Sequence, residues 1–107
     1  MAWKVNGIDI VMAEGDYGVA LPCEIHGAEL SAEDSIKFTI KYRKNGEEKV
    51  VKEYTNIENN TINIALTKSD TDKLPVGLYL YSLDWYKNNV FMYNIILDSE
   101  FRVVDKA

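Results

Sequence analysis

The one cysteine and the one histidine of the chain lie close together, at Cys23 and His26. A Cys-x-x-His pair provides two of the four ligands of a zinc site, and no other cysteine or histidine exists to complete it. In a strand, positions three apart also point to opposite faces of the sheet. We therefore expect no metal here, and interpret Cys23 as a small buried side chain and His26 as a surface residue at a strand end.

Two acidic pairs have the residue types of calcium or acid–base sites. Asp70 and Asp72 carry the carboxylates that Ca²⁺ prefers, but their segment lacks the twelve-residue loop with its glycine and terminal glutamate. We expect a solvated turn whose aspartates accept hydrogen bonds from local backbone. Glu47 and Glu48 would need a cleft to act as a glycosidase pair. They directly follow an Asn-Gly turn signal, which predicts a hairpin tip instead.

The remaining chemistry is limited to aromatic stacking. The glycines form no phosphate-binding loop before a helix, and no nucleophile elbow is present. We therefore predict that the protein is not an enzyme and has no catalytic residue, metal or cofactor. Trp85 and Tyr86, with Asn88 nearby, have the chemistry to stack on a sugar if they are exposed. They support one candidate function, a carbohydrate- or cell-wall-binding module.

The composition describes the domain that must position these residues. The chain has 107 residues, which predicts a single domain over 1–107. Hydrophobic residues make up 47% and charged residues 27%, a globular balance. The net charge of −5 argues against nucleic acid or an anionic membrane as a partner. No apolar run approaches the length of a membrane span, and the N-terminus lacks the pattern of a signal peptide.

Short alternating segments and frequent turn signals indicate an all-β fold. About a third of the residues are β-branched or aromatic, the types that favour strands. Turn signals recur every 8–12 residues, which is typical of an antiparallel sandwich or barrel, and a length near 100 residues favours the sandwich. We predict an immunoglobulin-like antiparallel β-sandwich of about seven to eight strands. The expected strands cover 8–13, 17–26, 36–44, 48–55, 61–66, 76–86, 90–97 and 100–104.

Some expectations concern single positions in this framework. Pro22 cannot donate to a ladder, so its strand is expected at an edge or interrupted there. Alternation predicts Ile62, Ile64 and Leu66 inward, and the polar stretch 67–74 allows one helical turn. Tyr79 follows a turn at the start of a long strand, the place of a tyrosine corner. An ordinary core aromatic explains Tyr79 equally well.

The last hairpin has an unusual distribution of apolar residues. A two-residue loop at Asn88 and Asn89 pairs Lys87 with Val90, and strict alternation then makes both faces mostly apolar. We expect Trp85 opposite Met92 on one face, that of Tyr81, Leu83, Asn94 and Ile96. The other face carries Leu80, Ser82, Asp84, Tyr86, Phe91, Tyr93, Ile95 and Leu97.

A sandwich strand needs only one apolar face, so the second face of this hairpin requires a cover. We hypothesise that the N-terminal arm with Trp3 or another subunit covers it. The candidate interface residues are Leu80, Tyr86, Phe91, Tyr93 and Leu97. The alternative is an ordinary mixed surface, marked by the polar atoms of Ser82, Asp84 and Tyr86.

The order of motifs along the chain resembles a known family. The motifs are a Gly15-Asp16 turn, an alternating strand from Asp34, the segment 61–67, Asp70-Thr71, the segment 74–81 (Leu-Pro-Val-Gly-Leu-Tyr-Leu-Tyr) and a closing strand at 100–103. Together they resemble the N-terminal domain family of phage baseplate upper proteins and similar small immunoglobulin-like phage tail and baseplate proteins. The resemblance covers roughly residues 8 to 104.

This resemblance implies a role in a virus particle. It implies a non-enzymatic phage or prophage virion structural protein, a tail or baseplate component that acts through protein–protein assembly. The implied partners are other tail or baseplate subunits, or further copies of the chain. The implied location is the virion, after synthesis in the cytoplasm of the bacterial host.

Overall fold

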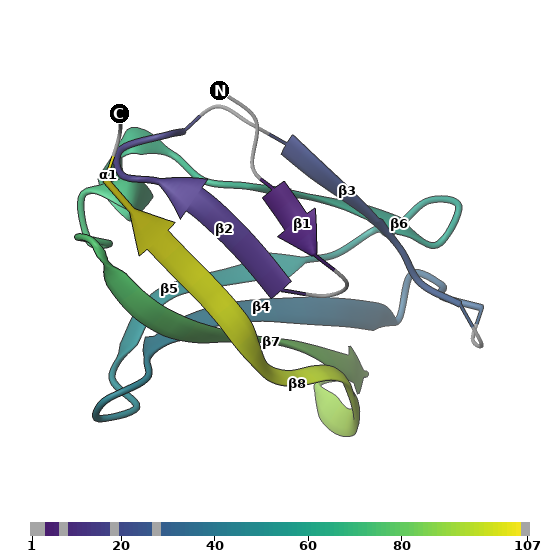
Figure 1. Cartoon of the computed structure of the whole chain (residues 1–107). Helices are drawn as coiled ribbons and strands as arrows, with labels where there is room; N and C mark the ends of the chain where they lie inside the picture. The colour runs from purple at the N-terminus through teal and green to yellow at the C-terminus, as the bar shows by residue number, and fades with distance from the viewer. Residues whose placement is uncertain (1–3, 7–8, 18–19, 27–28, 106–107) are drawn as a thin grey trace.

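The computed structural model describes residues 4–6, 9–17, 20–26 and 29–105. Strands account for most of these residues, and the one helix among them has a single turn. Figure 1 shows the arrangement of the elements. In chain order they are β1 (Lys4–Asn6), β2 (Asp9–Ala13), β3 (Ala20–Glu24), β4 (Asp34–Tyr42), β5 (Glu48–Tyr54), β6 (Thr61–Ala65), α1 (Lys68–Thr71), β7 (Gly77–Lys87) and β8 (Val90–Val104).

The strands form the all-β sandwich that the sequence predicts. One sheet has the order β1-β2-β8-β7-β4-β5, and β3 and β6 form the second sheet across the core (Figure 1). The hairpins β4–β5 and β7–β8 pair through β4 and β7, while the chain crosses to the other sheet for β3 and β6. This layout agrees with an immunoglobulin-like sandwich, in which strands C, F and G share one sheet and B and E share the other.

Two expectations about strands were wrong. The predicted sandwich was antiparallel throughout, but β2 runs parallel to β8, with Ile10 opposite Phe101. This happens because the chain leaves β2 for the opposite sheet, so β2 pairs with the last strand rather than with β3. The expected separate strands at 90–97 and 100–104 are one element, β8, which continues through Asp98 at a positive φ of 51°.

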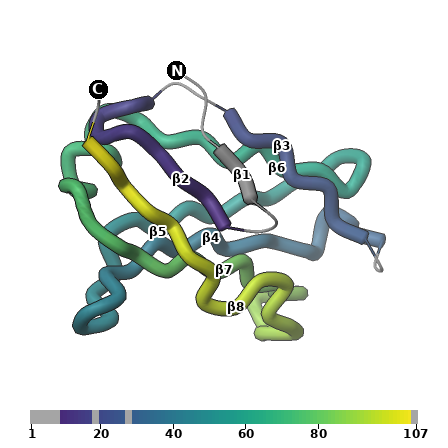
Figure 2. The backbone as a smooth tube through the Cα atoms, viewed as in Figure 1, coloured from purple at the N-terminus to yellow at the C-terminus, as the bar shows by residue number. Residues whose placement is uncertain are grey.

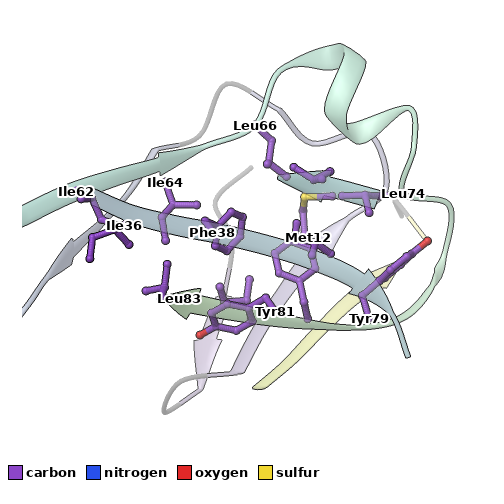
Figure 3. Close-up of a cluster of buried hydrophobic side chains, with 14 of the residues drawn as sticks. Met12, Ile36, Phe38, Ile62, Ile64, Leu66, Leu74, Tyr79, Tyr81 and Leu83 are labelled. Carbon is purple, nitrogen blue, oxygen red and sulfur yellow. The ribbon is translucent and has the colours of Figure 1, made fainter. Parts of the chain in front are cut away.

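The core lies between the sheets and follows the alternation of the sequence. Phe38 of β4 is completely buried, and Ile62, Ile64 and Leu66 point inward from β6 and its end as predicted. Figure 3 shows these β6 side chains facing the β4 and β7 side chains across the core. Phe38 also contacts Tyr81, with ring centroids 5.8 Å apart. Burial of such side chains provides most of the stability of a domain of this size.

One end of the sandwich is closed by α1 and by Tyr79. Thr67 caps α1, because its hydroxyl accepts from the Asp70 amide while the Asp70 carboxylate accepts from the Thr67 amide at 2.9 Å. The Tyr79 side chain is buried, and its hydroxyl donates to the Pro75 carbonyl at 2.7 Å. This is the bond back to upstream backbone that a tyrosine corner makes. It fixes the connection between α1 and β7 against the core.

We expect Tyr79→Phe to lower the free energy of unfolding by about 1–2 kcal/mol, because it leaves the Pro75 carbonyl without this donor. Urea denaturation of the wild type and variant measures the difference. Tyr17→Phe is the matched control, since Tyr17 is 51% exposed and its loss of a hydroxyl should change little. Equal stability of Tyr79→Phe and the wild type would show that Tyr79 stabilises the fold through its ring alone and not through the hydroxyl bond.

A second polar anchor joins the start of β4 to the end of β7. Asp34 is 1% exposed, and its carboxylate accepts from the Trp85 indole Nε1 at 2.7 Å and from the Ser31 amide at 2.7 Å. Burial alone would raise the pKa of Asp34, but these hydrogen bonds and the nearby Lys87 ammonium outweigh it and lower the pKa. Asp34 is therefore a buried carboxylate held in its charged form.

Candidate interaction surface

The groups that suggested metal or acid–base chemistry are structural or exposed. Cys23 is half-buried against the core, where burial raises the pKa of its thiol. The His26 side chain is 82% exposed at the end of β3, 3.4 Å from Glu24. Among the described residues no group of three or more His, Cys, Asp or Glu side chains is placed to hold a metal.

The acidic pairs have local partners. Asp70 was expected in a solvated turn, but it is buried and pairs with Lys52 of β5 at 2.6 Å. Burial works against this charge, yet Lys52 and the capping hydrogen bonds lower the pKa of Asp70. Glu47 lies at the tip of the β4–β5 hairpin as predicted, 2.8 Å from Lys49. Asp70 therefore stabilises the fold through its ion pair and the helix cap, while Glu47 lies on an exposed hairpin tip.

The β7–β8 hairpin departs from the predicted register. Lys87 pairs with Val90 and Tyr86 with Phe91 as expected, but Trp85 pairs with Tyr93 rather than with Met92. The seven residues 81–87 face the ten residues 90–99, because the register shifts at three places. Each such β-bulge adds a residue to one strand and moves the following side chains to the other face. Strict alternation along β8 was therefore wrong.

Polar side chains hold these irregularities in place. The Asp84 carboxylate accepts from the Asn94 amide at 2.6 Å, across the outer face of the sheet. The Ser82 hydroxyl lies 3.3 Å from the Asp98 carboxylate and accepts from the Asp98 amide. Lys41 extends this network with a 2.9 Å ion pair to Asp98. The outer face near the middle of β7 therefore consists of polar side chains with hydrogen-bond or ion-pair partners. It is not an apolar surface that requires a partner.

The five candidate interface residues separate accordingly. Tyr86 and Phe91 do share a face, with their rings edge to face at 5.7 Å. Tyr93 pairs with Trp85 and therefore shares the face of Trp85, which is the other face from Phe91. The prediction that Tyr93 and Phe91 share a face was wrong. Leu97 is 64% exposed, beside a register shift. Leu80 is half-buried opposite Glu100, farther along the sheet, and is not part of this cluster.

The structure exposes the apolar side chains of residues 90–93 and of Leu97, on either side of the half-buried residues 94–96, and we call residues 90–97 the β8 apolar segment. Of the eight large hydrophobic residues that the structure exposes in its described part, five belong to it: Val90, Phe91, Met92, Tyr93 and Leu97. Val90 and Met92 were missed, the latter because alternation placed it on the core face. The sequence did carry a signal, since no charged residue and no proline occurs at 90–97.

This segment also lies on an edge of the sheet that is unpaired in the described part of the chain. β2 pairs only with residues 101–104 of β8, and no strand among the described residues pairs with the outer edge of 90–99. Figure 2 shows the first part of β8 extending beyond the beginning of β2, because the two strands run parallel and pair only at the end of β8. The N-terminal arm with Trp3, one of the two covers hypothesised for this hairpin, lies outside the described residues.

The aromatic pair suggested for sugar stacking does not form a platform. The Trp85 ring is half-buried against the core and its indole N–H is used by Asp34. Tyr86 is directed to the opposite face, where it borders an open depression of about 410 Å³ lined also by Lys37, Val51, Glu53 and Asn89. Successive residues of a strand point to opposite faces, so the two rings cannot stack on one ligand.

Comparisons with family models, curated proteins and solved structures find no match to the chain. No helix among the described residues is long and apolar enough to span a membrane. The β8 apolar segment is the feature of the described surface that most needs explanation. Its chemistry is that of a protein contact: exposed aromatic, aliphatic and thioether side chains with no charge among them.

Proposed function

We propose that the protein is a non-enzymatic structural component that assembles with protein subunits through the β8 apolar segment. The observation that carries the proposal is the exposure of Val90, Phe91, Met92, Tyr93 and Leu97 along one stretch of β8, whose outer edge pairs with no strand among the described residues. Monomeric proteins rarely expose large contiguous apolar patches, and those that occur usually mark contact sites. Tyr and Phe are also among the residues enriched in the centres of interfaces.

The setting we propose is a phage or prophage virion, where the protein serves as a tail or baseplate component. This part of the proposal rests on the sequence resemblance over residues 8 to 104. An all-β sandwich whose β7–β8 hairpin exposes apolar side chains is suited to a subunit that binds neighbouring subunits. The other subunits of the particle, or further copies of the chain, are the proposed partners, with no nucleic acid, membrane or cofactor required.

The test substitutes the apolar segment without touching the core. We expect the double variant Phe91→Lys, Leu97→Lys to remain folded, because both side chains are about half or more exposed, at 49% and 64%. Light scattering after size exclusion, across a concentration range, should show a wild-type species larger than one chain that the double variant loses completely. Circular dichroism establishes that the variant is folded.

The matched control is Val51→Lys, Val76→Lys, which places the same charges at apolar positions of similar exposure, 46% and 47%, outside the segment. This control should assemble as the wild type does. A wild type that stays monomeric at every concentration contradicts assembly with further copies of the chain, and an assembly that survives the double substitution contradicts the role of the β8 apolar segment.

A further inference from the structure

A hollow in the described surface follows the connection between β5 and β6. Its volume is about 600 Å³, within the range of about 300–1,000 Å³ that small-molecule sites occupy. The described residues that line it are 54–59 and 61–63, so it shares no lining residue with the β8 apolar segment. We call it the β5–β6 hollow and consider what its side chains could bind.

The chain around the β5–β6 hollow is held by contacts with the rest of the fold. Ile57 is buried in the core and fixes the middle of the connection. The Asn60 side chain accepts from the Leu30 amide at 3.0 Å and donates to the Ile25 carbonyl at 3.3 Å. The hollow is therefore formed before any ligand arrives, which reduces the entropy that binding must overcome.

Asparagines occupy the left-handed backbone positions of this connection. Asn56, Asn59 and Asn60 have φ angles of 51°, 54° and 52°. Glycine adopts such angles without steric cost, so the backbone does not itself require an amide side chain there. Asn60 uses its amide to fix the connection. The side-chain amides of Asn56 and Asn59 form no hydrogen bond within the described part of the chain, although both residues line the hollow.

The other lining groups define what these amides could recognise. Asn63 of β6 adds a third side-chain amide with no hydrogen-bond partner among the described residues. Each amide both donates and accepts, as the hydroxyl groups of a sugar do. Glu58 is the one charged residue of the described lining, which contains no lysine or arginine. This carboxylate and the net charge of −5 disfavour an anionic ligand.

We propose that the β5–β6 hollow binds a neutral saccharide. The sugar hydroxyls exchange hydrogen bonds with the side-chain amides of Asn56, Asn59 and Asn63, and the apolar C–H surface of a sugar ring lies against Tyr54. This binding is independent of assembly through the β8 apolar segment, because no residue belongs to both surfaces. Either activity can therefore fail while the other stands.

A nuclear magnetic resonance titration of the ¹⁵N-labelled chain tests the proposal. The probes are glucose, N-acetylglucosamine, maltotriose and triacetylchitotriose, with glucuronic acid as the anionic comparison. At least one neutral probe should shift the backbone amides of residues 54–63 and the side-chain amides of Asn56 and Asn59, with a dissociation constant below about 10 mM. A trisaccharide that binds more tightly than its monosaccharide identifies a glycan chain as the ligand, and equal affinity identifies a single sugar unit.

Glycine substitutions remove the amides and keep the backbone. Asn56→Gly, Asn59→Gly should weaken binding at least tenfold, since glycine accepts both φ angles. The matched control is Asn88→Gly, Asn89→Gly, which makes the same changes at φ angles of 51° and 63° in the β7–β8 turn and should bind as the wild type does. If the first variant does not fold, Asn63→Ala replaces it.

Three results would overturn the saccharide site. They are the absence of binding by every neutral probe, shifts centred outside residues 54–63, and an unchanged affinity in the variant that lacks the amides. Tighter binding of glucuronic acid than of glucose would show that the ligand is anionic, which also contradicts the proposal.

Discussion

Replacing Phe38 by alanine is expected to lower the free energy of unfolding by about 3–5 kcal/mol. The Phe38 side chain is fully buried at the centre of β4, the strand that joins both hairpins of the larger sheet. Its ring faces β6 across the core and contacts Tyr81 beside it (Figure 3). Truncation removes apolar contacts with both sheets and leaves a cavity that the paired strands cannot collapse to fill.

Urea denaturation followed by tryptophan fluorescence measures the Phe38 effect. Val51→Ala is the matched control, because Val51 also lies in this sheet but is 46% exposed, and it should change stability by less than about 0.5 kcal/mol. If Phe38→Ala does not fold, Phe38→Leu provides a milder reduction of the same side chain, with an intermediate loss. A loss below about 1 kcal/mol in the alanine variant would mean that Phe38 does not occupy the core.

The position of Phe38 shows which part of the fold could be predicted from the sequence. Alternation over 36–42 and 61–66 reflects burial of one face, and this local pattern survives in the structure. The parallel pairing of β2 with β8 has no such local pattern, because it depends on where the first strand lies once the sandwich has formed. Sequence patterns therefore predict which face of a strand is buried more reliably than they predict which strand pairs with it.

The sequence placed the candidate interface on the last hairpin, where the structure exposes Phe91, Tyr93 and Leu97 but half-buries Leu80 and puts Tyr93 on another face. The pairing of Tyr86 with Phe91 could be predicted by counting residues from the turn at Asn88 and Asn89. Leu97 is exposed as predicted, but it lies at a register shift that the count did not include. The placement of Tyr93 failed because bulges in β8 depend on contacts such as Asp84 with Asn94, which form only in the folded hairpin. A more robust signal was the absence of charge over 90–97, which does not depend on register.

The second large effect is expected at Asp34, where substitution by asparagine should lower the free energy of unfolding by about 2–4 kcal/mol at pH 7. Both carboxylate oxygens of Asp34 accept hydrogen bonds, one from Trp85 and the other from the Ser31 amide and hydroxyl. An amide has only one acceptor oxygen, so its NH₂ group would face a donor in a buried site. No local pattern predicted this anchor, since Asp34 and Trp85 lie 51 positions apart.

The pH dependence of stability shows whether Asp34 acts through its negative charge or only through its shape. The pKa of Asp34 is lowered from its ordinary value of 3.8 in the folded protein, so the unfolded chain takes up the proton more readily. The stabilisation is therefore complete well above pH 4 and is lost as the pH falls through the folded pKa. Asp70, whose pKa is lowered by Lys52, contributes to the same acid sensitivity.

The difference in stability between the wild type and Asp34→Asn should therefore shrink as the pH is lowered from 7 to below 3.8, because only the wild type has this charge to lose. Urea denaturation at a series of pH values measures it, with Glu53→Gln as the control at an exposed position of β5. The control should follow the wild type at every pH. A difference that is constant with pH would show that Asp34 acts through shape and neutral hydrogen bonding. In that case the negative charge of Asp34 would not help to hold β7 against β4. The position of the β7–β8 hairpin and its apolar segment would then depend on neutral contacts alone.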